Sequence, residues 1–179
     1  MSDPYPRVIA LLTTAAEELL ARHGVTITLT SARGIPPKGR HIVGTIGFGG
    51  PHMKGHLAVL ADETFWRRVA PPELATGEKM LDETMLADMV GEIANMLLGR
   101  FRNAVLPLGA DIATAIPTAM CGTDLALHCS SLTKPDWHAF RSDHGFLFIR
   151  LHVAFRRAFH LSENAEWSLR PNEADLVLF

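Results

Sequence analysis

The sequence predicts a single α+β domain in which a mostly antiparallel sheet of about six strands packs with two main helices. Residues 7–22 and 82–103 have apolar side chains at helical spacing, and several shorter stretches have the composition of strands. The expected order is helix, three strands, short helix, long helix and three strands, which a sheet covered by helices explains most economically. We find no repeat and no low-complexity linker that would divide the chain.

Length and composition narrow the possible classes of function. The 179 residues suit one well-buried core, and 47% hydrophobic against 20% charged residues excludes wholesale disorder. A formal net charge of -2, without a basic stripe among aromatic residues, argues against a nucleic-acid partner. The apolar runs are shorter than the roughly 20 residues that cross a bilayer, and no secretory pattern opens the chain, so we expect a cytoplasmic protein without membrane contact. Cys121 and Cys129 are expected to be free thiols.

The first part of the chain is expected to form a helix followed by strands. The helix of residues 7–22 should end at the His-Gly pair that follows it. Alternation of valine, isoleucine and leucine with threonine over residues 25–29 predicts a strand, and a turn-rich connector follows at 34–39. Residues 41–48 and 53–60 predict a hairpin, because the loop between them has the right length and chemistry for its turn. The glycine-rich stretch at this turn matches no phosphate-binding motif.

The second part of the chain is expected to hold the long helix and the remaining strands. A short helix over residues 61–69 should be capped by Asp62, and the long helix should end near Asn103 because a proline and a glycine follow. Three further strands are predicted, over residues 111–120, 123–129 and 145–155. The core would then span about residues 5–155, and residues 156–179 are a C-terminal extension, either a small appended element or a tail that packs on a partner.

The 9 histidines raise the question of a metal site. His52 and His56 have the HxxxH spacing, but four residues of strand separate them by about 13 Å. His128 and Cys129 are consecutive in a predicted strand and point to opposite faces, so they cannot easily share an ion with Cys121. We therefore expect no metal site, and no serine or cysteine lies in a recognisable nucleophile motif.

The predicted long helix has one polar ridge, formed by Asp88, Glu92, Asn95 and Gly99. At about 100° per residue these positions fall within about 60° of one another. The apolar side chains of the helix lie on the opposite side: Leu86, Val90, Ile93, Ala94, Leu97 and Phe101. Gly91 and Gly99 lie on or beside the ridge although glycine costs a helix roughly 1 kcal/mol, which indicates a close approach by something else. From the residues alone, a docking surface and a plain solvated face both remain open.

The ridge is part of a longer sequence pattern. Asp88-x3-Glu92-x2-Asn95 continues as Met96-Leu97-Leu98-Gly99, and Ala115-Ile116-Pro117-Thr118 and Gly122 follow. This pattern resembles the signature of the chemotaxis phosphatases CheX, CheC and FliY, in which an acidic or serine residue, a glutamate and an asparagine share one helix and a proline follows the next strand. The likeness covers roughly residues 5–155. The spacing from Asn95 to Pro117 is one residue shorter than the usual pattern, and the first helix holds no second copy, which makes the chain similar to CheX rather than to the two-site CheC form.

The resemblance implies hydrolysis of the aspartyl phosphate of a CheY-type response regulator. Asn95 would orient the attacking water, because a carboxamide both donates and accepts hydrogen bonds. Glu92 would accept a hydrogen bond from the active-site lysine of the regulator. Few residues suffice, since phosphoryl transfer depends mainly on positioning and on stabilisation of charge. The chain itself would bind no cofactor, and the Mg²⁺ is expected in the regulator.

The resemblance also implies supporting residues and a homodimer. Asp88 would touch the rim of the regulator, while Gly91 and Gly99 would let its loops approach the helix backbone. Pro117 would shape the strand end beside the ridge. Two alternatives stay open: a non-catalytic CheX-like binding module that sequesters a regulator or mediates dimerisation, and a structural domain whose ridge is simply solvated.

Overall fold

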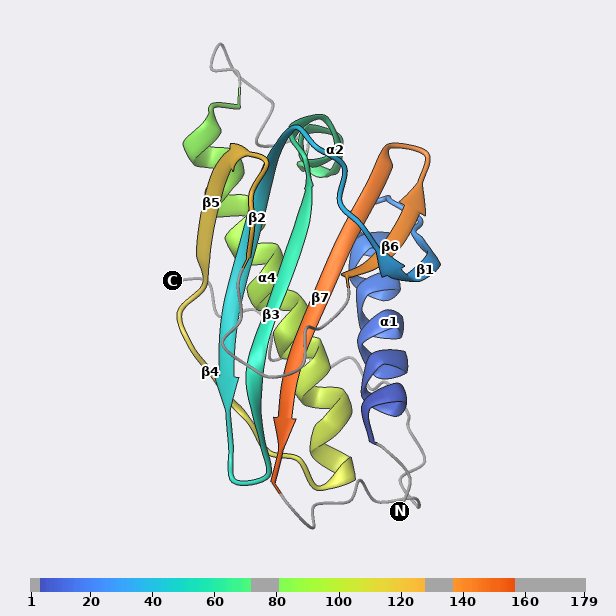
Figure 1. The fold of residues 1–179 in the computed structure, drawn as a ribbon, viewed down its shortest axis with the longest axis vertical. Coiled ribbons are helices and arrows are strands. Elements are labelled where there is room, and N and C mark those ends of the chain that lie inside the picture. The colour runs from blue at the N-terminus through green and yellow to red at the C-terminus, as the bar shows by residue number, and fades with distance from the viewer. Residues whose placement is uncertain (1–3, 72–80, 128–136, 157–179) are drawn as a thin grey trace.

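The computed structural model describes residues 4–71, 81–127 and 137–156 (Figure 1). Their elements follow the chain as α1 (Tyr5–Arg22), β1 (Thr28–Gly34), β2 (Arg40–Gly49), β3 (Met53–Asp62), α2 (Glu63–Val69), α4 (Glu83–Val105), the 3-10 helix η1 (Leu106–Leu108), β4 (Ala113–Thr114), β5 (Thr118–Thr123), β6 (Trp137–Ser142) and β7 (Gly145–Phe155). The predicted α+β class is confirmed, and the described residues hold seven strands where about six were expected.

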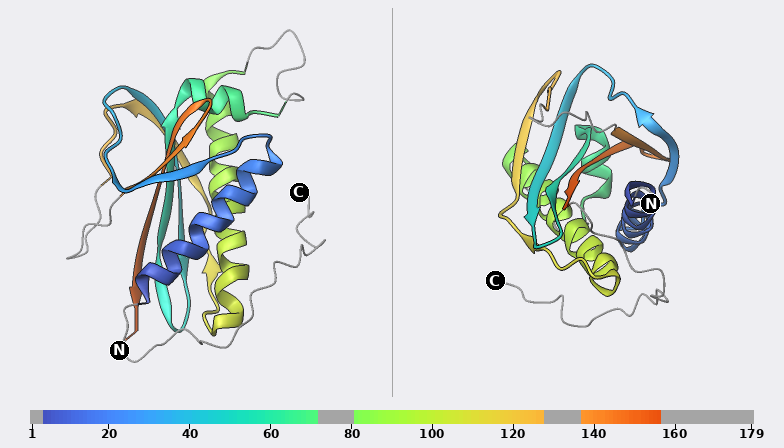
Figure 2. Two further views of the ribbon diagram at one scale, coloured as in Figure 1. Left: turned by 90° about the vertical axis from the view of Figure 1, so that its right-hand side faces the viewer. Right: turned by 60° about the horizontal axis from the view of Figure 1, so that its bottom comes forward.

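The strands form one antiparallel sheet in the order β1-β6-β7-β3-β2-β4, and β5 also pairs with β2. Both α1 and α4 lie on the same face of this sheet, so the domain has a helical layer and a sheet layer (Figure 2). β4 and β5 lie along the same side of β2 and form one edge of the sheet. Helix α4 crosses behind β2 and β3 and reaches β5 at this edge (Figure 1).

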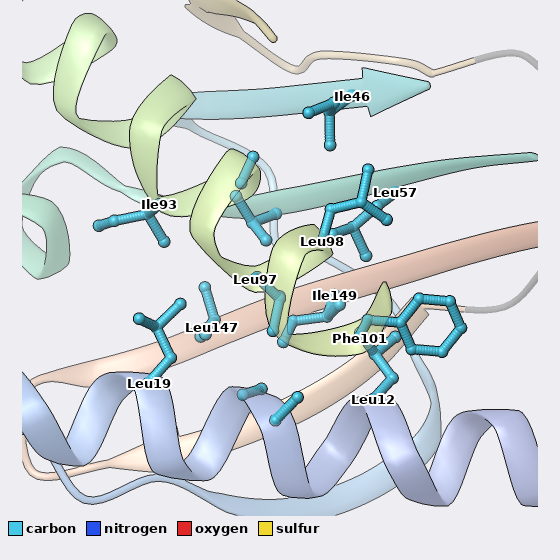
Figure 3. Packing of buried hydrophobic residues seen from close by; sticks show 14 of the residues in the cluster. Leu12, Leu19, Ile46, Leu57, Ile93, Leu97, Leu98, Phe101, Leu147 and Ile149 are labelled. Atoms are coloured by element: carbon cyan, nitrogen blue, oxygen red, sulfur yellow. The ribbon is translucent and has the colours of Figure 1, made fainter. Parts of the chain in front are cut away.

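The main core lies between the helices and the sheet. Figure 3 shows Leu12 and Leu19 of α1 facing side chains of α4, with the sheet behind both. The apolar side of α4 that the sequence predicts is confirmed, because all of its members are buried: Leu86, Val90, Ile93, Ala94, Leu97 and Phe101. A helix whose apolar stripe is fully covered has one allowed rotation about its axis. The core therefore fixes which side of α4 faces outward.

One glycine sets how closely α4 approaches the sheet. A Cβ atom built on Gly44 of β2 would lie 2.6 Å from the carbonyl oxygen of Val90 and 3.2 Å from Cβ of Ala94. No ordinary Cβ comes that close to a backbone oxygen, so a larger residue would push the helix away from β2. Gly44 thus positions the middle of α4 against the sheet.

Short helix α2 closes one end of the core. The predicted cap is confirmed, since Asp62 Oδ1 accepts a hydrogen bond from Phe65 N at 2.7 Å. Phe65 and Trp66 are fully buried, and Trp66 Nε1 donates to Ile42 O at 3.1 Å. The polar end of the indole is therefore satisfied inside the core.

The predicted strand over residues 25–29 was wrong in its position. β1 begins at Thr28 and extends to Gly34, which was expected in a connector. Val25 and Ile27 are buried all the same, and Val25 N bonds to Leu20 O at 2.9 Å as the chain leaves α1. The alternating apolar residues here are buried beneath the end of α1, and they are not paired in a strand.

The region after α4 also differs from prediction. The strand expected over 111–120 is divided into β4 and β5, and residues 124–127 form no strand where 123–129 predicted one. Residues 128–129 and the C-terminal extension beyond residue 156 lie outside the described residues. β6 was not predicted, and it pairs with both β1 and β7. Its place in the sheet is set by partners far away in the sequence.

Candidate functional site

The candidate site lies on the middle of α4, where the polar ridge was predicted. Asp82 caps the start of this helix, because its Oδ1 accepts a hydrogen bond from Met85 N at 2.8 Å. The carboxylate at the helix start also interacts favourably with the helix dipole. A capped first turn and a buried apolar side hold the ridge on a rigid element.

The ridge residues differ in exposure. Asp88 and Glu92 are exposed, whereas Asn95 and Gly99 are half-buried. Glu92 lies one turn before Asn95 on the same side of α4, so a carboxylate and a carboxamide are presented together. The predicted polar side of the helix is thus exposed along much of its length, with its most reachable acids at Asp88 and Glu92.

Gly91 is not part of the exposed ridge. It is buried, and a Cβ built there would lie 3.8 Å from Cβ of Ala119 and 4.0 Å from Cβ of Pro117. Gly91 therefore faces β5 and its neighbouring residues, which corrects the expectation that it leaves the helix backbone open. Gly99 is more open, because beyond its own helix turn no atom of the described residues lies within 4 Å of a Cβ built on it.

Pro117 lies in a bulge beside α4. Ala115, Ile116 and Pro117 connect β4 to β5 opposite only two residues of β2, since Thr114 pairs with Phe48 and Thr118 with Thr45. Ala115 N still bonds to Gly47 O at 2.8 Å. Proline suits such an edge position because it has no N–H to donate. The bulge brings Pro117 next to Gly91, the residue directly before Glu92 in the sequence.

Two exposed apolar side chains flank the site, and sequence reasoning did not single them out. Ile116 is 89% exposed in the bulge next to Pro117, and Met96 is 37% exposed next to Asn95. Met96 lies one turn after Glu92 on the same side of α4. For Met96 the helical wheel held only a weak signal, because the residue lies outside the apolar side of the predicted helix and single exposed apolar residues are common on protein surfaces.

An ion-pair network surrounds the start of α4. Arg40 of β2 contacts Glu83 of α4 and, through Nε, Glu63 of α2 at 3.4 Å. Arg67 Nη2 binds the same Glu63 at 2.6 Å, and this hydrogen bond is the main reason that the pKa of the Glu63 carboxyl is lowered. Burial, followed by a hydrogen bond to Glu83, raises the pKa of the nearby Cys121 thiol, which therefore does not favour the nucleophilic thiolate. The network ties α2, α4 and β2 together.

The described residues include no group of three or more histidine, cysteine, aspartate or glutamate side chains placed to hold a metal ion. His56 pairs across strands with His152, and their ring centroids are 5.1 Å apart. None of the helices within the described ranges is both long enough and apolar enough to span a membrane. Cys121 is a free thiol, as expected, and Cys129 lies outside the described residues.

The chain is similar in sequence to a known protein family. Residues 42–140, which include the hairpin, α4 and Pro117, match the family model described as chemotaxis phosphatase CheX. No protein of curated function matches the chain.

Solved structures share the fold at low sequence identity. The chemotaxis protein CheX from Vibrio vulnificus has a TM-score of 0.71 and 20% identity, covering 83% of this chain and 99% of that one. A CheC-like superfamily protein from Shewanella has a TM-score of 0.66 and 23% identity, covering 82% and 97%. A chain of the CheX-CheY-BeF3-Mg²⁺ complex from Borrelia burgdorferi has a TM-score of 0.64 and 17% identity, covering 81% and 96%.

Proposed function

The chain belongs to the family of the chemotaxis phosphatase CheX, and on this premise we propose that it hydrolyses the aspartyl phosphate of a CheY-type response regulator in the cytoplasm. The observation that carries the proposal is the pair of Glu92 and Asn95, one turn apart on the outward side of α4 with Pro117 close by. A CheX-CheY complex among the structural neighbours supports a regulator of this type as the partner.

Asn95 orients the attacking water in this proposal. Its carboxamide has no basic pKa near neutrality, but it can accept a hydrogen bond from water while donating another to the phosphoryl group. Because the transition state of phosphoryl transfer is loose, alignment of the water with the phosphorus is the main contribution needed from the phosphatase. The half-buried position of Asn95 limits the number of conformations that its side chain can adopt.

Glu92 docks the regulator. Its exposed carboxylate can accept a charge-assisted hydrogen bond from the active-site lysine of the regulator, which fixes the register of α4 on the partner. Asp88, one turn earlier, touches the rim of the regulator, and Gly99 leaves room for a partner loop. The Mg²⁺ belongs to the regulator, since the reaction needs the metal beside the phosphoryl group and not on α4.

Gly91 and Pro117 support the site from behind. Their proximity holds the edge of the sheet against α4 directly beside Glu92, so both act on the position of the helix. This differs from the direct contact with the partner that the sequence suggested for Gly91. The homodimer implied by the family resemblance remains part of the proposal, and sedimentation equilibrium of the full chain tests it.

A decay assay with a phosphorylated cognate regulator tests the proposal. We expect the wild-type chain to shorten the lifetime of the phosphoryl group, and Asn95→Ala to reduce this acceleration by about tenfold or more, since water placement is lost. Asn103→Ala is the matched control, because Asn103 is exposed on α4 about 12 Å further along the helix. An unchanged lifetime with the wild type, or equal acceleration by wild type and Asn95→Ala, refutes phosphatase activity at this site.

The rival function is a binding module without catalysis. It predicts that the chain binds the phosphorylated regulator while the rate of decay stays unchanged, and that Glu92→Ala abolishes the binding. Calorimetric titration of wild type and Glu92→Ala against the regulator, run beside the decay assay, separates the two functions. Binding that survives Glu92→Ala unchanged would contradict both, because both place the partner on the α4 ridge.

A further inference from the structure

The face of the sheet opposite α4 carries a cavity of about 310 Å³. His41, Leu60 and Arg150 line it from the strands, and they point away from the helices because neighbours such as Ile42 and Ile149 lie in the core between helices and sheet. The connection before β2 and the residues after β5 form its walls. This site is separated from the α4 ridge by the sheet and by α4 itself.

The two walls are joined by one backbone hydrogen bond and one bond between backbone and side chain. Asp124 N donates to Gly39 O at 2.9 Å, and Gly39 N donates to Asp124 Oδ1 at 2.8 Å. Asp124 has a positive φ of 52°, which non-glycine residues seldom adopt without a local hydrogen bond. Asp124 is the acidic residue of the lining, and its carboxylate already accepts this N–H. The cavity is therefore a built feature with tied walls.

Arg150 is the notable side chain of this cavity. It is only 8% exposed, and among the described residues no carboxylate forms an ion pair with it. Nη1 donates to Leu127 O at 2.8 Å, and Cζ lies 5.7 Å from the centroid of the Trp137 ring. Nε is buried and has no hydrogen-bond partner among the residues that the structure describes. A guanidinium has five N–H donors and a full charge, so a buried one usually has an anion nearby.

Further residues of the lining add a positive charge and apolar surface. Lys38 adds a second positive charge from the wall before β2. Leu60, Leu127 and Trp137 offer apolar surface beside these charges. Pockets of a few hundred Å³ with mostly apolar walls and a few charged groups are typical of small-molecule sites.

We propose that this cavity binds a small organic anion, a carboxylate or a phosphate on an apolar body. The anionic group lies against Arg150 and Lys38, because a planar guanidinium matches the geometry of either oxyanion and compensates its charge at short range. The apolar body packs against Leu60, Leu127 and Trp137. The anion supplies the counter-charge that the described residues do not give Arg150.

Calorimetric titration of the full chain with benzoate, phenyl phosphate and benzyl alcohol tests the inference. We expect saturable one-to-one binding of at least one of the two anions at concentrations up to about 10 mM, and about tenfold weaker binding of the neutral alcohol. The two anions distinguish a carboxylate from a phosphate ligand. No saturable binding of either anion, or equal binding of the alcohol, overturns the proposal.

Substitutions in the cavity lining test whether the anion binds at this place. Arg150→Gln and Lys38→Gln should each weaken anion binding by about threefold or more, whereas Lys54→Gln should leave it unchanged. Lys54 is the matched control, as it is exposed on β3 outside the cavity lining. If Arg150→Gln does not fold, Lys38→Gln alone decides, because Lys38 is an exposed loop residue. Binding that Lys38→Gln leaves unchanged, or that Lys54→Gln weakens equally, overturns the site.

Discussion

The two faces of the sheet differ in what they bury. The face under α1 and α4 holds the large apolar core, whereas the opposite face holds a small apolar cluster of Val43, Ala58, Leu60, Ala139 and Phe148 together with charged and imidazole side chains. Stability comes mainly from the first face, because free energy gained by burial scales with apolar area. The first face can therefore hold α4 rigidly for chemistry at its outer side, while the second is free to carry groups that contribute little to folding.

The largest expected effect on stability comes from replacing a glycine on one face of β2, and a glycine on its other face is the matched comparison. Gly44→Ala places a Cβ 2.6 Å from Val90 O, so α4 must shift, and we expect a loss of about 2 to 3 kcal/mol in the free energy of unfolding. Gly47→Ala on the opposite face meets its nearest atom, Cβ of Ala115, at 3.6 Å, and we expect a change below about 1 kcal/mol. Urea unfolding of both variants measures the difference.

The same pair tests whether the core positions the site. The shift forced by Gly44→Ala moves Glu92 and Asn95 relative to the edge strand, so the variant should also lose acceleration of regulator decay at temperatures where it is folded. Equal stabilities of Gly44→Ala and Gly47→Ala would show that the close contact of α4 with β2 is not what holds the helix in place.

Elements with a strong local pattern could be predicted from the sequence. The helix expected over 7–22 is α1, and the strand expected over 145–155 matches β7. The same alternating pattern gave a wrong prediction where apolar residues are buried without pairing to a neighbouring strand. Leu125 and Leu127 alternate as a strand would, but they pack on the small apolar cluster as loop residues. β6 lacks a distinctive pattern, and its pairing with β1 and β7 depends on distant partners.

In the candidate site, too, the sequence predicts the local pattern but not the contacts with distant strands. A helical wheel predicts which side of α4 is polar, and the exposure of Asp88 and Glu92 follows that prediction. It does not predict how far a neighbouring strand extends around the helix. For this reason Gly91, only about 60° from Asp88 on the wheel, lies under the edge of the sheet while Gly99 stays open.

Replacing each of these two glycines by alanine tests, with a smaller expected effect, whether they have different roles within α4. Gly91→Ala and Gly99→Ala should each raise the free energy of unfolding by up to about 1 kcal/mol, because alanine favours a helix and the contacts given for the described part of the chain start at 3.8 Å from either Cβ. Only Gly99→Ala should slow dephosphorylation of the regulator, since its methyl group projects from the ridge that the partner approaches. Decay assays and thermal unfolding of both variants provide the comparison. A loss of activity in Gly91→Ala alone would reverse the roles assigned to the two glycines.

The smallest expected effect concerns pH and the second face of the sheet. Burial, then the charges of His152 and Arg150, lower the pKa of His56 from its ordinary value of 6.5. Below pH 6.5 the unfolded chain takes up a proton that the folded chain resists, so the stability contributed by neutral His56 is present above this pH and declines as the pH falls. His56→Gln should therefore lose less stability than the wild type between about pH 7 and pH 5 in urea unfolding. His144→Gln is the control, because His144 is exposed in the turn between β6 and β7. If His56→Gln retains the full pH dependence of the wild type, neither burial nor the neighbouring cations act on this imidazole, and the contrast between an apolar helical face and a charged opposite face is weakened.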